Sequence, residues 1–286
     1  MVVQDRRGGA VAAAVVCGTG LMAGLLATAG CSPNGAAADD QVAPARAPAA
    51  VELRRSVEAL LRAGTARVRT AMETVSGGTL VAIRGAGGYD FATASGQLRL
   101  VLPDLKGKPS GGNQPITEVL APGALFMKNR GAGVPADKWV RVDTATLPDG
   151  NLVTGGATDP LAAAELLRGV REVTFQGQER WGGVPVRHYR GTTDLAAAAG
   201  RASARTRPAL VAAEKGFTTM VVPFDAYVDD AGRLRKVRQR FRFANGVPAG
   251  ASVTSTTELY AFGSPVVVRL PDRRDIFTGK ISAASA

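Results

Sequence analysis

The chain has 286 residues, of which 45% are hydrophobic and only 5% aromatic, and its formal net charge is +11 at pH 7. This length and apolar content allow one large domain or two small ones with a substantial core. One histidine and two cysteines are too few for a Cys/His metal site. Because Cys17 lies in the N-terminal apolar segment, no cysteine pair remains for a disulfide in a folded domain. We therefore expect no metal, no cofactor and no enzymatic activity.

Residues 1–30 have the pattern of an export signal. Arg6 and Arg7 form a positive start, residues 10–27 are apolar apart from Gly and one Thr, and small residues follow. An uncleaved membrane-spanning anchor is the alternative, because an apolar run of this length can just cross a bilayer. Several glycines interrupt the run, however, and it ends at a cysteine.

The segment "LATAGC", which ends at Cys31, resembles the lipobox of bacterial lipoproteins. This resemblance implies cleavage before Cys31 and acylation of its thiol, for example with palmitate. Two or three acyl chains would hold the protein firmly in a membrane, whereas one holds only marginally. Residues 31–50 are rich in Ala, Pro, Gly and Asp without periodicity, which is typical of a flexible tether. We expect a lipid-anchored protein on the extracytoplasmic face of the cell membrane.

The binding partner that the positive net charge indicates depends on whether the protein lies inside or outside the cell. In a cytoplasmic protein it would indicate nucleic acid as the partner, which we do not expect here. At the cell surface it favours contact with anionic lipid head groups or wall polymers. The basic residues are scattered through predicted strands, so a merely solvated basic face is the alternative.

Residues 51–63 have apolar positions at helical spacing, and Gly64 ends the predicted helix. The period then changes to two, which indicates half-buried strands. A loop is predicted at residues 106–115. The predicted strands of this half are residues 65–75, 77–85, 88–94, 96–103, 116–122, 124–130 and 138–143.

Asp159 and Pro160 open the next predicted helix, because Asp is a good N-cap and Pro is preorganised for the first helical position. This helix reaches about Arg168. A second, alanine-rich helical region covers roughly residues 194–216 and is interrupted near Pro208. The predicted strands of this half are residues 171–181, 183–194, 218–230, 232–243 and 254–263, with hairpin turns at 182–183 and 229–232.

The sequence thus predicts about ten or eleven short strands and three helices. Strands adjacent in sequence pair antiparallel, so the fold class is α+β, with helices covering one face of a large curved sheet. We expect residues 51–286 to form one domain. No heptads or long apolar faces require an oligomer, and we expect a monomer.

Three segments, "GVPVRHYRGTTDL" (183–195), "VPFDAYVDDAGRLRKVRQRF" (222–241) and "LYAFGSPVVVRLP" (259–271), resemble the LppX/LprAFG group of actinobacterial lipoproteins. The resemblance covers most of residues 51–271. It implies a LolA/LolB-like fold, in which a half-barrel of antiparallel strands wraps around helices and leaves an apolar cavity. The implied function is lipid binding and lipid transport, in which the cavity holds the acyl chains of lipids or lipoglycans for carriage or transfer across the envelope.

A curved sheet needs an apolar inner face, and alternation along the strands supplies candidates for the cavity lining. Each of these residues could equally belong to a fully packed hydrophobic core. In a cavity that is apolar with few polar groups, Met would suit variable acyl chains because its side chain is flexible. The candidates are Val68, Met72, Val81, Ile83, Leu98, Leu100, Leu102, Leu125, Met127, Phe241 and Phe243.

Other candidate sites have simpler interpretations. His188 lies in a predicted strand without a second metal ligand or a serine partner, so a structural role is favoured. Asp229 and Asp230 are typical of a hairpin turn, because a calcium loop needs more oxygen ligands at defined spacing. Two functions remain as alternatives to lipid carriage. One is a sensor or interaction lipoprotein on the same fold that binds an envelope protein partner; the other is a wall-associated lipoprotein with a fully packed core.

Overall fold

The computed structural model describes residues 46–76, 79–102, 114–130, 133–243 and 252–279. All of them belong to one compact unit, Val42–Ala286. The predicted export signal, Cys31 and most of the predicted tether lie outside the described residues. Within the described ranges, no helix is both long and apolar enough to cross a membrane.

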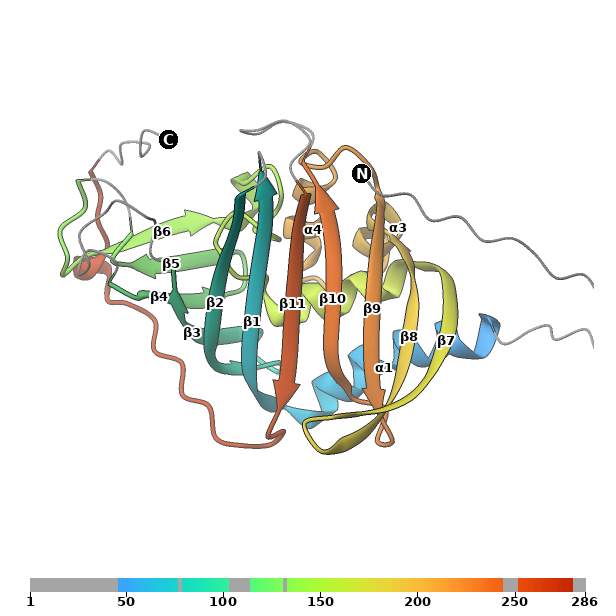
Figure 1. Ribbon diagram of the computed structural model, residues 1–286. Helices are drawn as coiled ribbons and strands as arrows, with labels where there is room; N and C mark the ends of the chain where they lie inside the picture. Colours follow the sequence, from blue (N-terminus) through green and yellow to red (C-terminus); the bar gives the residue numbers. More distant parts are fainter. Residues whose placement is uncertain (1–45, 77–78, 103–113, 131–132, 244–251, 280–286) are drawn as a thin grey trace, which may run out of the picture. The chain divides into compact units, whose positions relative to one another are not determined.

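Within these ranges, eleven strands form one antiparallel sheet in the order β6-β5-β4-β3-β2-β1-β11-β10-β9-β8-β7 (Figure 1). The strands of the first half are β1 Thr65–Ser76, β2 Thr79–Asp90, β3 Ser95–Val101, β4 Ile116–Ala121, β5 Ala124–Lys128 and β6 Trp139–Asp143. Those of the second half are β7 Val170–Trp181, β8 Val184–Asp194, β9 Val221–Asp229, β10 Leu234–Arg242 and β11 Ser252–Tyr260.

In the described residues, four α-helices and three short 3₁₀-helices complete the fold. The α-helices are α1 Arg46–Ala63, α2 Pro160–Glu165, α3 Leu195–Arg201 and α4 Arg207–Ala213. The 3₁₀-helices are η1 Thr144–Thr146, η2 Leu166–Gly169 and η3 Arg273–Asp275. This arrangement of a curved antiparallel sheet with helices confirms the predicted fold class.

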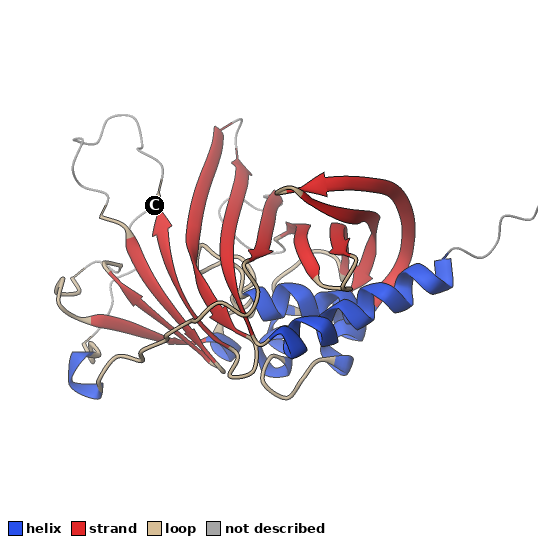
Figure 2. Ribbon diagram, turned by 90° about the horizontal axis from the view of Figure 1, so that it is seen from below, coloured by secondary structure: helices blue, strands red, loops and turns tan. Residues whose placement is uncertain are grey.

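The α-helices lie against one face of the sheet, which we call the inner face. Figures 1 and 2 show them across the part that contains β7–β11, whereas β3–β6 extend beyond them. The main core forms where Leu53, Val57 and Leu60 of α1 join buried side chains of the sheet, among them Val68 and Leu259. A second core cluster lies beneath α3 and α4.

The outer face of β4–β6 is covered by the coil that follows β11. Val268 and Ile276 of this coil pack against Val119 and Phe126, which point outward from β4 and β5. The coil is fixed to the edge strand by a hydrogen bond from the Phe277 N–H to the Trp139 carbonyl, 2.8 Å long. Most residues of β4 and β5 are therefore buried on both faces of the sheet.

The structure corrects two predicted boundaries. Helix α1 begins at Arg46 rather than at residue 51, because alanines with high helix propensity precede it and the buried Ala49 already packs against the core. The predicted strands 77–85 and 88–94 are one strand, β2, followed by a turn. Ala86 and Gly87, which separate the two predicted strands, continue the strand together with Gly85 and Gly88.

These glycines allow β2 and its neighbours to approach closely. A Cβ atom at Gly87 would lie 1.9 Å from the Gln97 carbonyl oxygen on β3. A Cβ atom at Gly85 would lie 2.5 Å from both the Leu100 and the Thr70 side chains. Glycine is required at these positions because a side chain would collide with the neighbouring strand, and not because the backbone has a positive φ.

We expect Gly87→Ala to lower the free energy of unfolding by about 1–3 kcal/mol, because the methyl group forces the backbones of β2 and β3 apart. Gly200→Ala is the matched control: it lies in helix α3 with open space around it. That change should raise stability by up to about 1 kcal/mol. Urea unfolding of the full chain measures both, and equal effects of the two substitutions would contradict the close-approach argument.

Candidate ligand-binding site

All the predicted cavity residues occupy positions of inner-face parity, but they divide between two clusters. Five of them belong to the main core next to α1: Val68, Leu98, Leu100, Leu125 and Met127. Met72 and Phe241 belong to the cluster beneath α3 and α4, with Phe243 at its border. Ile83 and Leu102 are half-buried at the border of the main core. Val81 is half-buried and belongs to neither cluster.

A coil, residues 147–158, covers the inner face of β2–β5. A Cβ atom at Gly156 would lie 3.2 Å from Leu100 and 3.6 Å from Ile83. A Cβ atom at Gly155 would lie 3.0 Å from Leu125. The coil therefore rests directly on several of the predicted cavity residues, where its glycines allow close contact.

The coil folds around one buried carboxylate. Asp149 accepts hydrogen bonds from the N–H groups of Asn151, Val153 and Thr154, at 3.2, 2.8 and 2.7 Å. The Thr158 hydroxyl donates to the Leu152 carbonyl at 2.5 Å. These bonds lie within the coil itself, and a further one, between the Thr158 and Ser255 hydroxyls at 2.6 Å, ties the end of the coil to β11.

A small hollow lies between the β4–β5 turn, this coil and α4. Its lining includes Leu120, Asn151 and Asp159, and its volume is about 30 Å³. Ligand pockets for molecules of drug size measure roughly 300–1,000 Å³. The hollow can hold a water molecule but not an acyl chain.

Glu118 is the most unusual polar residue of the inner face. Its side chain has the same parity as the buried Ile116 and Leu120, and its register partners are Leu98 on β3 and Met127 on β5. The residue is 0% exposed, and neither carboxyl oxygen has a hydrogen-bond partner. Burial raises the pKa of Glu118 from 4.5 to about 8, although the charge of Arg130 opposes this shift. A neutral carboxyl group thus lies among aliphatic side chains at pH 7.

Sequence reasoning missed Glu118, although the pattern contained the signal. In "ITEVLA" the glutamate alternates in phase with Ile116 and Leu120, whereas Thr117 and Val119 have the opposite phase. A charged residue in the apolar phase of a strand indicates a polar group inside the fold.

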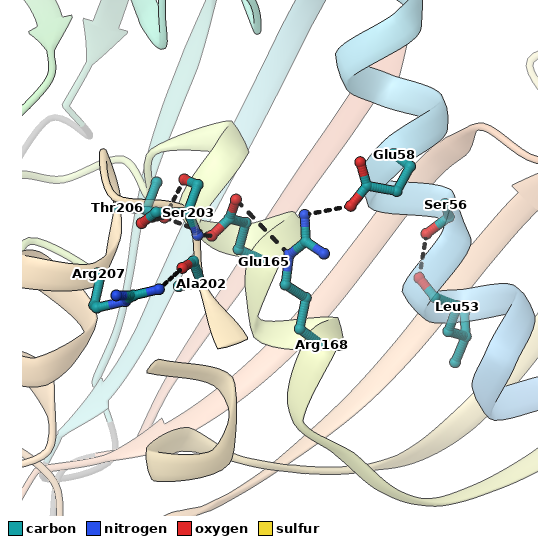
Figure 3. A network of polar contacts seen from close by, with 9 residues as sticks. All are labelled: Leu53, Ser56, Glu58, Glu165, Arg168, Ala202, Ser203, Thr206 and Arg207. Carbon is teal, nitrogen blue, oxygen red and sulfur yellow. Dashed lines mark hydrogen bonds and ion pairs between the residues drawn. The ribbon is translucent and has the colours of Figure 1, made fainter. Parts of the chain in front are cut away.

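A second buried carboxyl group binds the helical layer together (Figure 3). Glu165, at the end of α2, is 0% exposed. It accepts hydrogen bonds from the Thr206 hydroxyl at 2.5 Å and from the Ser203 N–H at 2.8 Å, both in the α3–α4 connection. Arg168 lies 3.8 Å from Glu165 and pairs with Glu58 of α1 at 2.7 Å. The network therefore joins three helical segments that are distant in sequence.

Asp159 has the role that the sequence predicted and a further one. It caps α2 by accepting hydrogen bonds from the N–H groups of Leu161 and Ala162. It also accepts one from the Tyr89 hydroxyl at 2.9 Å, which fixes α2 to strand β2. Burial, followed by the charge of Asp159, raises the pKa of Tyr89, so this phenol stays protonated and donates.

His188 lies on the outer face between two carboxylates. Its Nδ1 is 2.8 Å from Glu179 and its Nε2 is 3.0 Å from Asp225, and its ring stacks on Tyr227. Both ring nitrogens are engaged, which supports the structural role that we predicted. In the described part of the chain, no group of three or more His, Cys, Asp or Glu side chains could hold a metal ion.

The predicted turn at residues 229–232 is confirmed. Asp229 accepts hydrogen bonds from the N–H groups of Ala231 and Arg233, at 3.1 and 2.9 Å. Its second oxygen pairs with the Arg233 side chain at 3.0 Å. Gly232 adopts a positive φ of 74°. The carboxylate thus stabilises the turn itself.

Comparison with known proteins shows similarity of fold at low sequence identity. No protein-family model matches the sequence, and no curated protein matches it. The lipoprotein LppX from Mycobacterium tuberculosis is 12% identical with a TM-score of 0.46, over 78% of this chain and 99% of that one. LprF from Mycobacterium bovis is 14% identical with a TM-score of 0.39, over 77% and 97%.

A domain of the outer membrane lipoprotein-sorting type from Vibrio parahaemolyticus is also similar. It is 8% identical with a TM-score of 0.31, over 74% of this chain and 95% of that one. LppX and LprF belong to the group that the sequence resembles. At identities this low, the similarity concerns the fold of the chain and does not identify a ligand.

Thr206→Val should lower the free energy of unfolding by about 1.5–3 kcal/mol, because it removes a hydroxyl donor from the buried Glu165 carboxylate. Ser203→Ala is the control: the Ser203 N–H that binds Glu165 remains, and only a hydroxyl contact with Thr206 is lost. Its effect should be smaller. Urea unfolding of the full chain compares the two, and a larger loss for Ser203→Ala would contradict this role of Thr206.

Glu118 should make stability depend on pH. Its pKa in the folded state, about 8, lies above the ordinary value of 4.5 that applies when the chain is unfolded. Its contribution is therefore fully present below pH 4.5 and falls as the pH rises to about 8. Glu118→Met removes this dependence, and we expect it to be more stable than the parent by about 3 kcal/mol at pH 7.

The measurement is urea unfolding of the full chain at pH 5 and at pH 7.5. The control is Glu172→Met, since Glu172 is exposed, and this change should alter stability by less than about 0.5 kcal/mol. The same pH dependence in Glu118→Met and in the parent would show that the Glu118 carboxyl is not buried in a neutral form.

Proposed function

We propose that this chain is a membrane-anchored envelope lipoprotein whose inner sheet face holds the acyl chains of lipids or lipoglycans, for carriage or transfer across the envelope. The observation that carries the proposal is the way the inner face of β2–β5 is covered. Next to α1 the sheet packs against a helix, whereas on β2–β5 it lies under the coil of residues 147–158.

A coil that holds its own hydrogen bonds can move from an apolar surface more easily than a helix in the core. Moving it uncovers Leu100 and Leu125, which an acyl chain would cover again. The exchange replaces one apolar contact by another, so little hydrophobic free energy is lost. Glycines in the coil and the flexible Met127 beneath it favour such a rearrangement.

The border of the inner face offers a route to this surface. Ile83 on β2 and Leu102, which directly follows β3, are only half-buried, as are Val134 and Val142 near β6. Farther along the same face, between Leu98 and Met127, the protonated Glu118 carboxyl can donate a hydrogen bond to a hydroxyl or ester oxygen of a ligand. An apolar surface with few polar groups is typical of a small-molecule site.

The predicted anchor fits this function. Fourteen residues lie between Cys31 and the start of α1 at Arg46. Fully extended, they span at most about 50 Å. Acylated Cys31 would therefore keep the domain within reach of the membrane surface from which a lipid is taken.

The proposal is tested by photo-crosslinking of the full-length protein in membranes that contain a diazirine-bearing palmitoyl lipid. Peptide mass spectrometry should find crosslinks on β2, β3 and the coil of residues 147–158. Ile83→Trp should reduce them at least about fivefold, because the indole fills the border of the inner face. Crosslinks confined to the region around Cys31 in folded protein would overturn the proposal.

The matched control uses the next position of the same strand. Ala82 has the opposite parity and points to the outer face, so Ala82→Trp adds the same ring on the other side of the sheet. It should leave crosslinking unchanged. Equal losses in the two variants would show that the ring acts through the stability of β2 and not through the inner face.

A further inference from the structure

The outer face of β1–β3 carries a group of arginines around one small residue. Register places Ala86 of β2 directly between Arg69 of β1 and Arg99 of β3. Arg84 precedes Ala86 by two residues and therefore points to the same face. Because neighbouring strands lie about 4.8 Å apart, the backbone positions of the three arginines lie close around Ala86.

The small side chains leave a hollow between these arginines, which we call the arginine hollow. Its volume is about 310 Å³, and Arg69, Arg84, Arg99, Gly85 and Ala86 line it. Glu258, beside Arg69, is the one acidic residue in its lining. A second hollow of about 330 Å³ shares Ala86 and Arg99, adds Arg67 and reaches the coil after β11.

The arginines of the hollow are free to bind an external anion. Across the described ranges, Arg67, Arg69, Arg84 and Arg99 form no ion pair with a carboxylate. Other arginines of the sheet do so: Arg190 pairs with Asp225 at 2.9 Å. Arg69 instead lies over the Tyr260 ring, 4.5 Å from its centre, which holds the guanidinium in place. Guanidinium groups in this arrangement suit phosphate, which they bind through paired N–H donors.

Exposed aliphatic side chains share the outer face with the arginine hollow. Val75 and Leu80 face each other across β1 and β2 near the tip of the hairpin and are 54% and 62% exposed. Val101, in the lining of the hollow, is 55% exposed. These side chains would add nothing to the binding of a soluble phosphate. They would strengthen binding to a bilayer, because aliphatic groups can enter between the lipids while the arginines contact the lipid phosphates.

We propose that the outer face of β1–β3 docks on an anionic lipid bilayer, with Arg69, Arg84 and Arg99 contacting lipid phosphates. Val75, Leu80 and Val101 enter the head-group layer beside them. The proposal is independent of lipid binding at the inner face, because it uses the opposite side of the sheet and different residues.

The test is vesicle flotation of the full chain carrying Cys31→Ser, which removes the predicted acylation site. Vesicles contain equal parts of phosphatidylglycerol and phosphatidylcholine, or phosphatidylcholine alone. The readout is the ratio of binding to the two kinds of vesicle, since any binding of the N-terminal apolar segment contributes to both. We expect a preference for anionic vesicles that weakens as salt is raised. Arg69→Glu with Arg84→Glu should reduce the ratio roughly 25-fold, because each basic residue near an anionic surface contributes about fivefold.

The control is Arg55→Glu with Arg62→Glu, which makes the same change of charge on exposed residues of α1. It should reduce the ratio far less, and both double variants should unfold at the same urea concentration as the parent. Equal losses in the two double variants would overturn the proposal, because net charge alone would then explain binding. Displacement from anionic vesicles by millimolar glycerophosphate at constant ionic strength would also overturn it, and would identify the hollow as a site for a soluble phosphate ester.

Discussion

The pairing of β1 with β11 is the constraint on which the rest of the fold depends. These strands stand nearly at opposite ends of the domain, yet their ladder runs from Arg67–Tyr260 to Val75–Ser252. It joins two meanders, β1–β6 and β7–β11, into one sheet with a continuous inner face and a continuous outer face. Without it, β1 and β11 would each present an unpaired edge.

Because the sheet is continuous, its two faces can bind different partners. The inner face is apolar and is covered partly by helices and partly by a coil, and there we place acyl-chain binding. The outer face of β1–β3 is basic, and there we place contact with the bilayer. Alternation in strands such as β2 assigns Ile83 to one surface and Arg84 to the other, so neighbouring residues can serve separate functions.

Much of this arrangement could be predicted from local sequence. The twofold alternation identified nearly all strands, and Asp159 and Gly232 marked a helix start and a turn because their roles depend on neighbouring residues only. Gly87 was misread for the same reason: glycine is typical of turns, and nothing nearby shows that β3 approaches at this point. The coil of residues 147–158 has no periodicity, so its position over Leu100 could not be predicted. The surroundings of Glu118 and of Ala86 depend on strand register, which brings together residues from separate segments and cannot be predicted from local sequence.

The described part of the chain also shows how buried polar groups organise the helical layer. Glu165 and Asp159 lie near the two ends of α2 and bind different neighbours, the α3–α4 connection and Tyr89. Glu165 accepts two hydrogen bonds from the α3–α4 connection and Asp159 accepts one from Tyr89, so both carboxyl groups fix α2 to its neighbours. Glu118 has no such partners, and this contrast is why we assign it to a ligand rather than to the framework.

The coil after β11 covers surfaces of the sheet that would be exposed if the chain were cut. It covers Phe126 and lies along the edge strand β6 through Trp139 and Ile276. A molecule clipped just after β11 would keep its complete sheet but uncover an aromatic patch and a free strand edge. Free strand edges and exposed apolar patches favour association with other chains. We therefore expect the clipped molecule to associate and the intact one not to, although both contain the whole sheet.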